Sequence, residues 1–519
     1  MSRSFFVRVA LAAMTAGGIV SLIGCLGKRS YFAARPVPPS TILQRVLVAI
    51  QNPSPTAQGS LQILDGRYDI RNSENGKIPN FFIGGYSGAL PSMIQNYPEE
   101  TTGYVYNSGS GQISSINYSS EKQTGNISNL PGVSASVFVT KDGNYTFAAN
   151  QVAQFLTVID GVAAREVALN LPNIYKVSVN PSGTVALAFV QNSNYAYRVI
   201  RLQQPNGTVM QPPVFHPTNG PWPAAVSPVD CQPVNLPLYC VIPVLDQNDN
   251  PIQFSRPYNT IFSADGTTGW LLNCGPECGN SSVDPVIGQA AASVSFLNLG
   301  PLNIYNFPGS TYPSPPPVPP LPTEQQRVAV PGGATMALYG NGALYVSGQQ
   351  LQPDGLFEGF LSIINLATNS VTATYPISDG LHTKMLFGDD NTLWIGSQLC
   401  SSGERTAKNL INPITGKLDN GCLTFVDLTK LNQPNYLPFL EPAYGDLTGL
   451  CAIIQWHKIY TAYGGQIHIF ATWDKGITTS GGRVSTGFTA GSEVPNFTAT
   501  VQGTAYDVAY MDATSDAAN

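Results

Sequence analysis

Side chains that can carry acid–base chemistry are scarce in this sequence of 519 residues, which contains four histidines. His216 lies in a proline-rich segment, His457 follows a tryptophan near a turn, and His468 alternates with isoleucines. His382 stands at the start of a short apolar segment. Lys384 follows two residues later, so we expect both side chains on one face of a strand. His382 is therefore the best single candidate for a general base or a ligand.

Charged residues occupy similar positions at the start of other apolar segments. Together with the pair above they make five candidate site residues: His382, Lys384, Lys176, Arg256 and Asp507. If their strands converge, the cluster can stabilise an oxyanion or hold a carboxylate, as a lactone hydrolase or an anion-binding pocket requires. The simpler interpretation, which we favour, is a set of hydrated polar side chains without catalytic function.

Established catalytic motifs are missing. The sequence has no Gly-x-Ser-x-Gly elbow, no His-Glu-x-x-His motif, no Walker loop, no dinucleotide-binding glycine pattern and no haem-attachment motif. We therefore expect no cofactor and no metal. The formal net charge is −6 and no basic patch stands out, which argues against nucleic-acid binding.

A repeated pattern of short strands must position the candidates. Apolar segments flank turns of Gly, Asp or Asn, and the first three turn glycines, Gly103, Gly143 and Gly183, are spaced 40 residues apart. Such turns need a positive φ angle, which these residue types adopt most readily. A third strand ending in Asp or Asn often follows, as in FLTVID (Phe155–Asp160), and a fourth leads to the next unit. Four strands in about forty residues are typical of a β-propeller blade.

The two ends of this repeated region complete each other. Arg45–Ile70 resembles the second to fourth strands of a blade, and Gly503–Ala513 resembles a first strand. Their pairing would close the ring and remove open sheet edges. We predict an all-β protein with a single β-propeller of seven to eight four-stranded blades, closed by N- and C-terminal strands. First strands, which would line the central channel, are expected near Met93, Val137, Val177, Ile261, Met336, Met385, Ala452 and Val508.

One blade also carries a family resemblance. The segment VFVTKDGNYTFAANQVAQFLTVIDG (Val137–Gly161) is similar to the blades of YVTN-type and lactonase-like β-propellers of secreted bacterial proteins. Other blades match in part, and Asn117 stands where that pattern has Asp. The resemblance covers roughly residues 42–512. It implies the fold but little about activity, because propellers include binding proteins, lyases, hydrolases and redox enzymes.

The N-terminal segment predicts export. Arg3 and Arg8 precede the uncharged stretch Val9–Ile23, which is short for a membrane span and typical of a signal peptide. Leu22-Ile23-Gly24-Cys25 resembles the lipobox of bacterial lipoproteins, so we predict a signal peptide over 1–24 and lipidation of Cys25. An ordinary signal peptide or an uncleaved anchor is the alternative. Leu26 is not the Asp that marks inner-membrane retention, which favours the outer membrane or the cell surface.

Export makes disulfides the expected state of the remaining cysteines. Their spacing suggests three pairs and leaves Cys451 unpaired in an apolar run: Cys231–Cys240, Cys274–Cys278 and Cys400–Cys422. A metal site at Cys274 and Cys278 is disfavoured because no second Cys or His pair lies close by.

We divide the chain into the signal peptide, a tether over 25–41, the propeller over 42–512 and a tail over 513–519. Two proline-rich stretches, 203–256 and 307–327, interrupt the repeat. They are expected to be insertions between blades, and the alternative is that they form a lid or a docking surface.

Taken together, these features favour an exported, lipid-anchored β-propeller that acts as a binding or assembly module at the bacterial cell envelope. Its partner would be an envelope protein or a glycan, and it would reach the membrane through its N-terminal lipid. The alternative is a lactonase-like hydrolase with its site at the channel mouth. A structural envelope protein without a specific ligand is a third possibility, and the sequence leaves open whether the protein is an enzyme.

Overall fold

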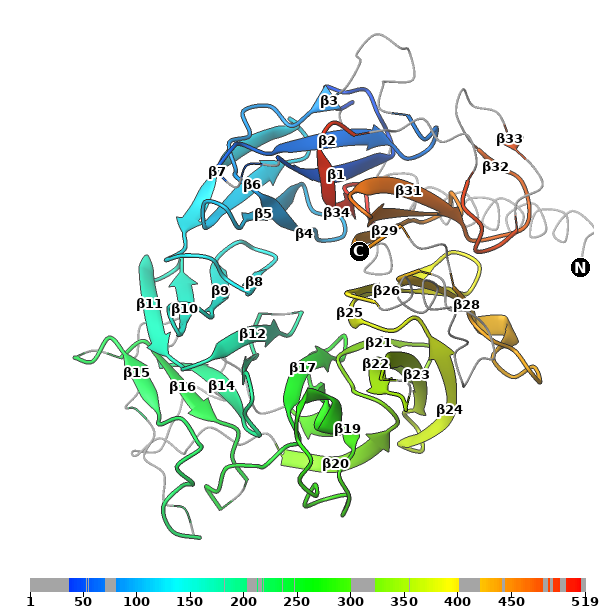
Figure 1. Ribbon diagram of the computed structural model, residues 1–519. Coiled ribbons are helices and arrows are strands. Elements are labelled where there is room, and N and C mark those ends of the chain that lie inside the picture. The colour runs from blue at the N-terminus through cyan, green and yellow to red at the C-terminus, as the bar shows by residue number, and fades with distance from the viewer. Residues whose placement is uncertain are drawn as a thin grey trace, which may run out of the picture.

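The computed structural model describes residues 37–514 apart from 53, 55, 71–80, 182, 203–211, 213–216, 218, 236, 247, 300–322, 354, 401–420, 441–443, 479–483, 486–488 and 495–500. The predicted signal peptide, Cys25, most of the tether and the end of the tail therefore lie outside the described residues. Within them, eight antiparallel sheets surround a common centre as the blades of a β-propeller (Figure 1). No helix of this described part is long and apolar enough to cross a membrane.

The strands of each blade follow one another from the channel outward. Blade 1 contains β34 (Thr504–Tyr510), β1 (Arg45–Gln51), β2 (Ser60–Asp65) and β3 (Phe81–Phe82); blade 2 contains β4 (Pro91–Gln95), β5 (Thr102–Asn107), β6 (Gln112–Asn117) and β7 (Lys122–Asn129). Blade 3 contains β8 (Ser136–Val139), β9 (Tyr145–Asn150), β10 (Phe155–Asp160) and β11 (Arg165–Asn170); blade 4 contains β12 (Ile174–Val179), β13 (Ala186–Val190), β14 (Ala196–Arg201), β16 (Tyr239–Pro243) and β15 (Asp230–Gln232).

The second half of the ring follows the same order. Blade 5 contains β17 (Pro257–Phe262), β18 (Thr268–Asn273), β19 (Ala292–Asn298) and β20 (Thr323–Val330); blade 6 contains β21 (Met336–Gly340), β22 (Ala343–Leu351), β23 (Phe357–Asn365) and β24 (Ser370–Ile377). Blade 7 contains β25 (Leu381–Gly388), β26 (Thr392–Gln398), β27 (Leu423–Asp427) and β28 (Phe439–Leu440); blade 8 contains β29 (Leu447–Ile453), β30 (Lys458–Tyr463) and β31 (Gln466–Ala471). The short strands β32 (Ile477–Thr478) and β33 (Val484–Ser485) pair with each other, and the 3-10 helices η1 (Gly275–Cys278) and η2 (Leu428–Lys430) lie in connections.

The predicted fold class is confirmed, with eight blades, and all eight predicted inner-strand positions fall on inner strands. The turn chemistry acts as expected. Gly143 has a φ angle of +70°, and the Asp142 carboxylate before it accepts hydrogen bonds from Thr140 Oγ1 and the Asn144 amide. Blades pack face to face through apolar side chains, as where Trp394 of blade 7 meets Phe470 of blade 8. The core is therefore divided into layers between neighbouring blades.

The predicted insertion over 203–256 needs correction. Its part Tyr239–Pro243 is β16, the fourth strand of blade 4, and Asp230–Gln232 forms the fifth strand β15. The prolines around these strands indicate a loop, but the intervening β-branched and aromatic residues pair with β14. Likewise, β20 begins at Thr323, so the last residues of the predicted insertion over 307–327 belong to blade 5.

The antiparallel order of every blade gives the ring two distinct faces. We call the face at which the inner strands begin the mouth face, and the opposite one the far face. In blade 1, β1 starts at the far face, because its residue Val46 pairs with Tyr510 at the end of β34. The connections that follow β14 and β19 also leave from the far face, since third strands run away from the mouth. The described ends of the chain and the connections after β14 and β19 therefore lie at the far face, whereas the loop between β16 and β17 lies at the mouth face.

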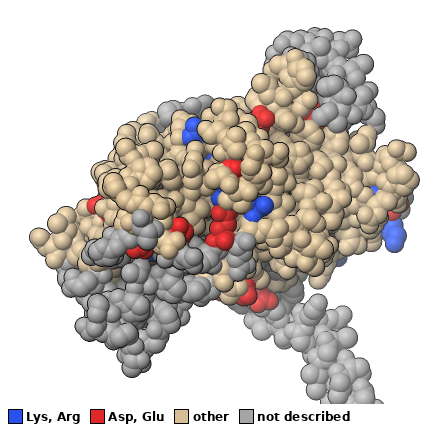
Figure 2. Space-filling view, turned by 90° about the horizontal axis from the view of Figure 1, so that it is seen from below, with Lys and Arg blue, Asp and Glu red and all other residues tan. Residues whose placement is uncertain are grey.

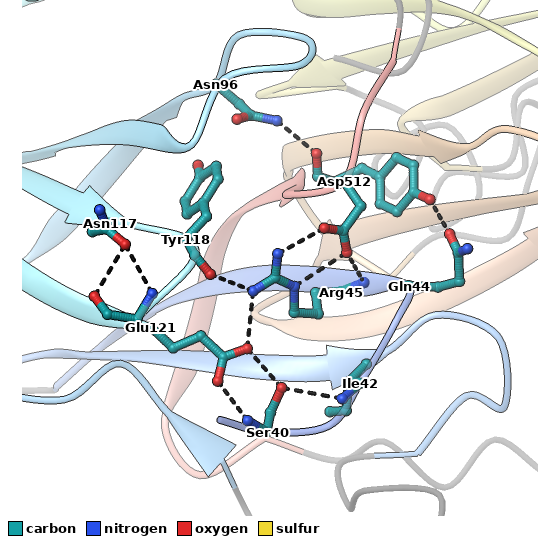
Figure 3. A network of polar contacts seen from close by, with 11 residues as sticks. Ser40, Ile42, Gln44, Arg45, Asn96, Asn117, Tyr118, Glu121 and Asp512 are labelled. Atoms are coloured by element: carbon teal, nitrogen blue, oxygen red, sulfur yellow. Dashed lines mark hydrogen bonds and ion pairs between the residues drawn. The ribbon is translucent and has the colours of Figure 1, made fainter. Parts of the chain in front are cut away.

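A buried polar network fixes the entry of the chain at this far face (Figure 3). The Arg45 guanidinium forms ion pairs with Asp512, at 2.7 Å, and with Glu121, at 3.0 Å, and all three side chains are buried. Glu121 in turn accepts hydrogen bonds from the backbone amide and hydroxyl of Ser40. The network thus joins the residues before β1, the residues after β34 and the β6–β7 turn of blade 2. Elsewhere charged side chains are few, as expected from a charged fraction of 11%, and the side shown in Figure 2 carries only scattered ones.

We predict that Arg45→Met lowers the free energy of unfolding by about 3–5 kcal/mol, because two carboxylates would stay buried without their cation. Lys141→Met is the matched control: Lys141 pairs with Glu100 at 3.1 Å, but this pair is exposed and its loss should cost less than about 1 kcal/mol. Urea unfolding at neutral pH measures both variants. Equal losses for the two would contradict a structural role of the Arg45 network.

Candidate functional site

A cavity of about 820 Å³ opens at the mouth face of the central channel. We call it the mouth cavity. Its lining comes from the first residues of seven inner strands, all except β21, and from adjacent loops. A smaller cavity of about 180 Å³ lies further along the channel and shares Thr383 and Lys384 with it. The larger one has the volume of a typical pocket for a small molecule.

Backbone bulges shape the mouth cavity. In six blades the inner strand has one extra residue near its start, which pairs with no residue of the neighbouring strand. A bulge of this kind interrupts the alternation of side chains and redirects one of them. All six bulged residues line the mouth cavity: Ser92, Tyr175, Tyr258, Thr383, Thr448 and Tyr506.

The bulge at Thr383 overturns the prediction that His382 and Lys384 share a face. His382 pairs with Ser397 and Lys384 with Gly396, so Thr383 is the extra residue. His382 is buried and donates a hydrogen bond from Nε2 to the carbonyl oxygen of Ser378 at 2.7 Å. Burial lowers the pKa of His382 to about 4, against a smaller opposing effect of this hydrogen bond. His382 is therefore neutral at physiological pH and does not line the mouth cavity.

Asp507 is also absent from the cavity lining. Its buried carboxylate forms an ion pair with Lys384 Nζ at 2.9 Å and accepts a hydrogen bond from the backbone amide of Ile94 at 2.8 Å. These contacts join β34 to β25 and to β4, which belong to three different blades. Asp507 is thus a structural link near the channel axis, and it neutralises the charge that Lys384 brings to the cavity.

Lys176 and Arg256 are the two predicted residues that line the cavity without an ionic partner in the described structure. Lys176 Nζ lies 5.2 Å from the centre of the Tyr258 ring, and burial lowers the pKa of this lysine to about 8. Arg256 has a positive φ angle of 55°, its Nη2 donates a long hydrogen bond of 3.4 Å to Gly279 O, and its Nε is buried without a partner. Among the described residues that line the cavity there is no Asp or Glu.

The tyrosines of the cavity are the residues that the sequence analysis missed. Tyr175 Oη donates to the carbonyl oxygens of Pro257 and Tyr258 at 3.2 and 3.1 Å, and the Tyr175 and Tyr258 rings lie 5.4 Å apart. They connect the inner strands of blades 4 and 5 beside both free cations. One signal was present in the sequence: Ile-Tyr-Lys, Pro-Tyr-Asn and Ala-Tyr-Asp place a tyrosine at the same step of three inner strands.

The three disulfides are the pairs expected from the spacing, and Cys451 is buried and unpaired. Cys278 lines the mouth cavity, so the Cys274–Cys278 bridge ties the loop after β18 to its wall. The Cys400–Cys422 bridge joins the ends of the connection between β26 and β27, which lie at the mouth face. Among the described residues no cluster of three or more His, Cys, Asp or Glu side chains is placed to hold a metal ion.

No model of a protein family matches the chain, and no curated protein matches it. Similar solved structures include the periplasmic gluconolactonase of Pseudomonas aeruginosa, which is 13% identical, with 90% of this chain and 98% of that chain covered and a TM-score of 0.39. A protein from Bacteroides fragilis, named as a candidate 6-phosphogluconolactonase, is 10% identical over 90% and 97% of the two chains, with a TM-score of 0.40. The β-propeller domain of Cps50 from Myceliophteria thermophila is 8% identical over 74% and 97%, with a TM-score of 0.40. At these values the likeness extends to the propeller architecture alone.

We predict that Lys176→Met raises the melting temperature at pH 7. Below pH 8 the folded protein holds a desolvated charge that the unfolded chain exposes to water, so this lysine opposes folding. Between pH 8 and the ordinary lysine value of 10.5 the unfolded chain binds more protons, and the penalty fades. Thermal unfolding at pH 7 and pH 9.5 should show that the melting temperature of Lys176→Met exceeds that of the wild type by less at the higher pH. If Lys176→Met melts at a lower temperature than the wild type at pH 7 while Lys141→Met is unchanged, the charge of Lys176 does not destabilise the folded protein and the prediction is wrong.

Proposed function

We propose that the protein is an exported, lipid-anchored β-propeller that binds a partner at the bacterial cell envelope, with the mouth cavity as its binding site. One observation carries this proposal: Lys176 and Arg256, two cations without ionic partners among the described residues, line a cavity of ligand size whose described lining contains no acidic residue. Around them, hydroxyl and amide side chains make up most of the lining. Such convergent polar groups in a concave site are typical of ligand recognition.

The chain enters the ring on the face opposite the mouth cavity, and this arrangement suits a protein that is tethered through its N-terminal segment. The chain enters at the far face, where Ser40 contacts Glu121, so a lipid on Cys25 would leave the mouth open to the surrounding compartment. A partner in the envelope, either a protein or a glycan, could then reach the cavity without passing the tether. The connection between β19 and β20 leaves from the same far face, whereas the loop between β16 and β17, at the end of the other proline-rich stretch, lies at the mouth face and contributes Arg256 to the cavity.

The hydrolase alternative receives less support from the geometry. A general base must lie within hydrogen-bond reach of its substrate. His382 is buried outside the cavity, and Asp507 is paired with Lys384. The described lining holds no histidine and no carboxylate, so a binding site fits these residues better than a catalytic one.

Capture of envelope components on the immobilised, lipidated protein tests the binding site. Gln151→Trp places a large ring at the rim of the cavity, whereas Val152→Trp changes the adjacent residue, which is 87% exposed and does not line it. We expect the partner to be lost from Gln151→Trp and retained by Val152→Trp. A variant that lacks 307–322 should also retain it, because the strands that this stretch connects, β19 and β20, meet it at the far face. Loss from the deletion variant alone would move the binding surface to the far face.

We further predict that the protein hydrolyses a panel of lactones and esters no faster than buffer does. His382→Ala should leave these rates unchanged, since the imidazole does not reach the cavity. Product formation is measured by a pH-indicator assay, with variants compared at equal folded concentration. Turnover in the wild type that falls in His382→Ala would restore the hydrolase hypothesis.

A further inference from the structure

We infer that the ligand of the mouth cavity is a saccharide that carries a carboxylate, and that Lys176 and Arg256 bind this carboxylate. The inference rests on the proposed function and specifies its ligand class. Three features of the cavity support it: its charges, the contacts that place the two cations, and the chemistry of the remaining lining.

The charge arrangement of the cavity differs from that around most cations of the core. Several buried or half-buried cations elsewhere in the described structure are paired with carboxylates: Arg45, Arg201, Arg327 and Lys458. Within the cavity, Lys384 is likewise paired with Asp507. Arg198, which is buried on β14 with guanidinium nitrogens that find no hydrogen-bond partner, does not line the cavity. Lys176 and Arg256 have no carboxylate partner and are held in a partly enclosed space. Because an unpaired, desolvated cation is unfavourable until an anion neutralises it, the cavity favours an anionic ligand over a neutral or cationic one.

The two cations come from neighbouring blades, and local contacts link the segments that carry them. The Tyr258 ring lies 5.2 Å from Lys176 Nζ and follows Arg256 by two residues. The hydrogen bonds from Tyr175 to Pro257 O and Tyr258 O fix β12 against β17. Lys176 lies on β12 and Arg256 directly precedes β17, so these braced strands support both charges. A guanidinium offers a planar pair of donors that matches a carboxylate, and an ammonium adds a point charge.

The neutral part of the lining indicates what carries the carboxylate. Side-chain amides line the rim, with Gln151 and Gln191 in turns and Gln398 at the end of β26, while serine, threonine and tyrosine hydroxyls come from both strands and loops. These groups both donate and accept hydrogen bonds, which suits a ligand with many hydroxyls. Tyrosine rings add flat apolar surface of the kind that a sugar ring can cover. A fatty acid or another largely apolar acid would leave these polar groups without partners.

Calorimetric titration of the purified protein with D-glucuronate, D-glucose and inorganic phosphate tests the inference. Glucuronate and glucose have the same sugar ring, but glucuronate carries a carboxylate where glucose has a hydroxymethyl group. Phosphate provides negative charge without a sugar ring. We expect glucuronate to bind about tenfold more tightly than glucose, because charge-assisted hydrogen bonds contribute more than neutral ones, and about tenfold more tightly than phosphate, because its ring hydroxyls add hydrogen bonds to the neutral lining. Lys176→Gln and Arg256→Gln should each weaken glucuronate binding by about tenfold, and Lys141→Gln, an exposed lysine outside the cavity, should not change it.

Each outcome decides the question. Glucuronate binding that both variants lose and the control keeps supports the inference. Phosphate that binds as tightly as glucuronate, with the same dependence on Lys176 and Arg256, would overturn it in favour of a general anion site. Absence of glucuronate binding, while Gln151→Trp still abolishes capture of an envelope partner, would overturn the ligand class and leave the proposed function standing. If capture also fails to depend on Gln151, the proposed function fails with it.

Discussion

The pairing of β34 with β1 is the interaction on which the rest of the structure depends. It joins residues more than 450 positions apart in the chain, such as Val46 and Tyr510, into one sheet. A propeller with an unpaired inner strand would expose a sheet edge to solvent and to other chains. The buried pair of Arg45 and Asp512 secures the end of this pairing. Because removal of one partner would leave a buried charge, we interpret the pair as a device that selects one register.

The same closing strand contributes to the mouth. Asp507 of β34 reaches Lys384 of blade 7 and the Ile94 amide of blade 2, and the adjacent Tyr506 lines the cavity. Closure of the ring and construction of the cavity therefore use neighbouring residues of one strand. A loss of pairing at β34 would consequently change both the global stability and the position of Lys384.

The fold could be predicted from the sequence because its signals are local. A turn such as Asp142-Gly143 and the strands beside it identify a blade without knowledge of the others. The site could be predicted only in part. Simple alternation assigns His382 and Lys384 to one face, but the bulge at Thr383 separates them. A bulge is set by the register between two strands, and a single strand sequence does not contain that information. Lys176 and Arg256 were identified from their positions at strand starts, whereas their lack of ionic partners became evident only from the assembled ring.

That lack of partners has a thermodynamic consequence. An apolar side chain in place of Lys176 would avoid the desolvation that lowers the pKa of this lysine. Proteins often keep residues that oppose stability where function requires them. The enclosed position that penalises the free charge also reduces the screening of its attraction to an anion. Lys384 of blade 7 lines the same cavity, but its charge is neutralised within the protein by the carboxylate of Asp507. The cavity therefore combines one lysine whose charge is satisfied internally with two cations whose charge remains available, and only the latter can contribute net attraction to a ligand.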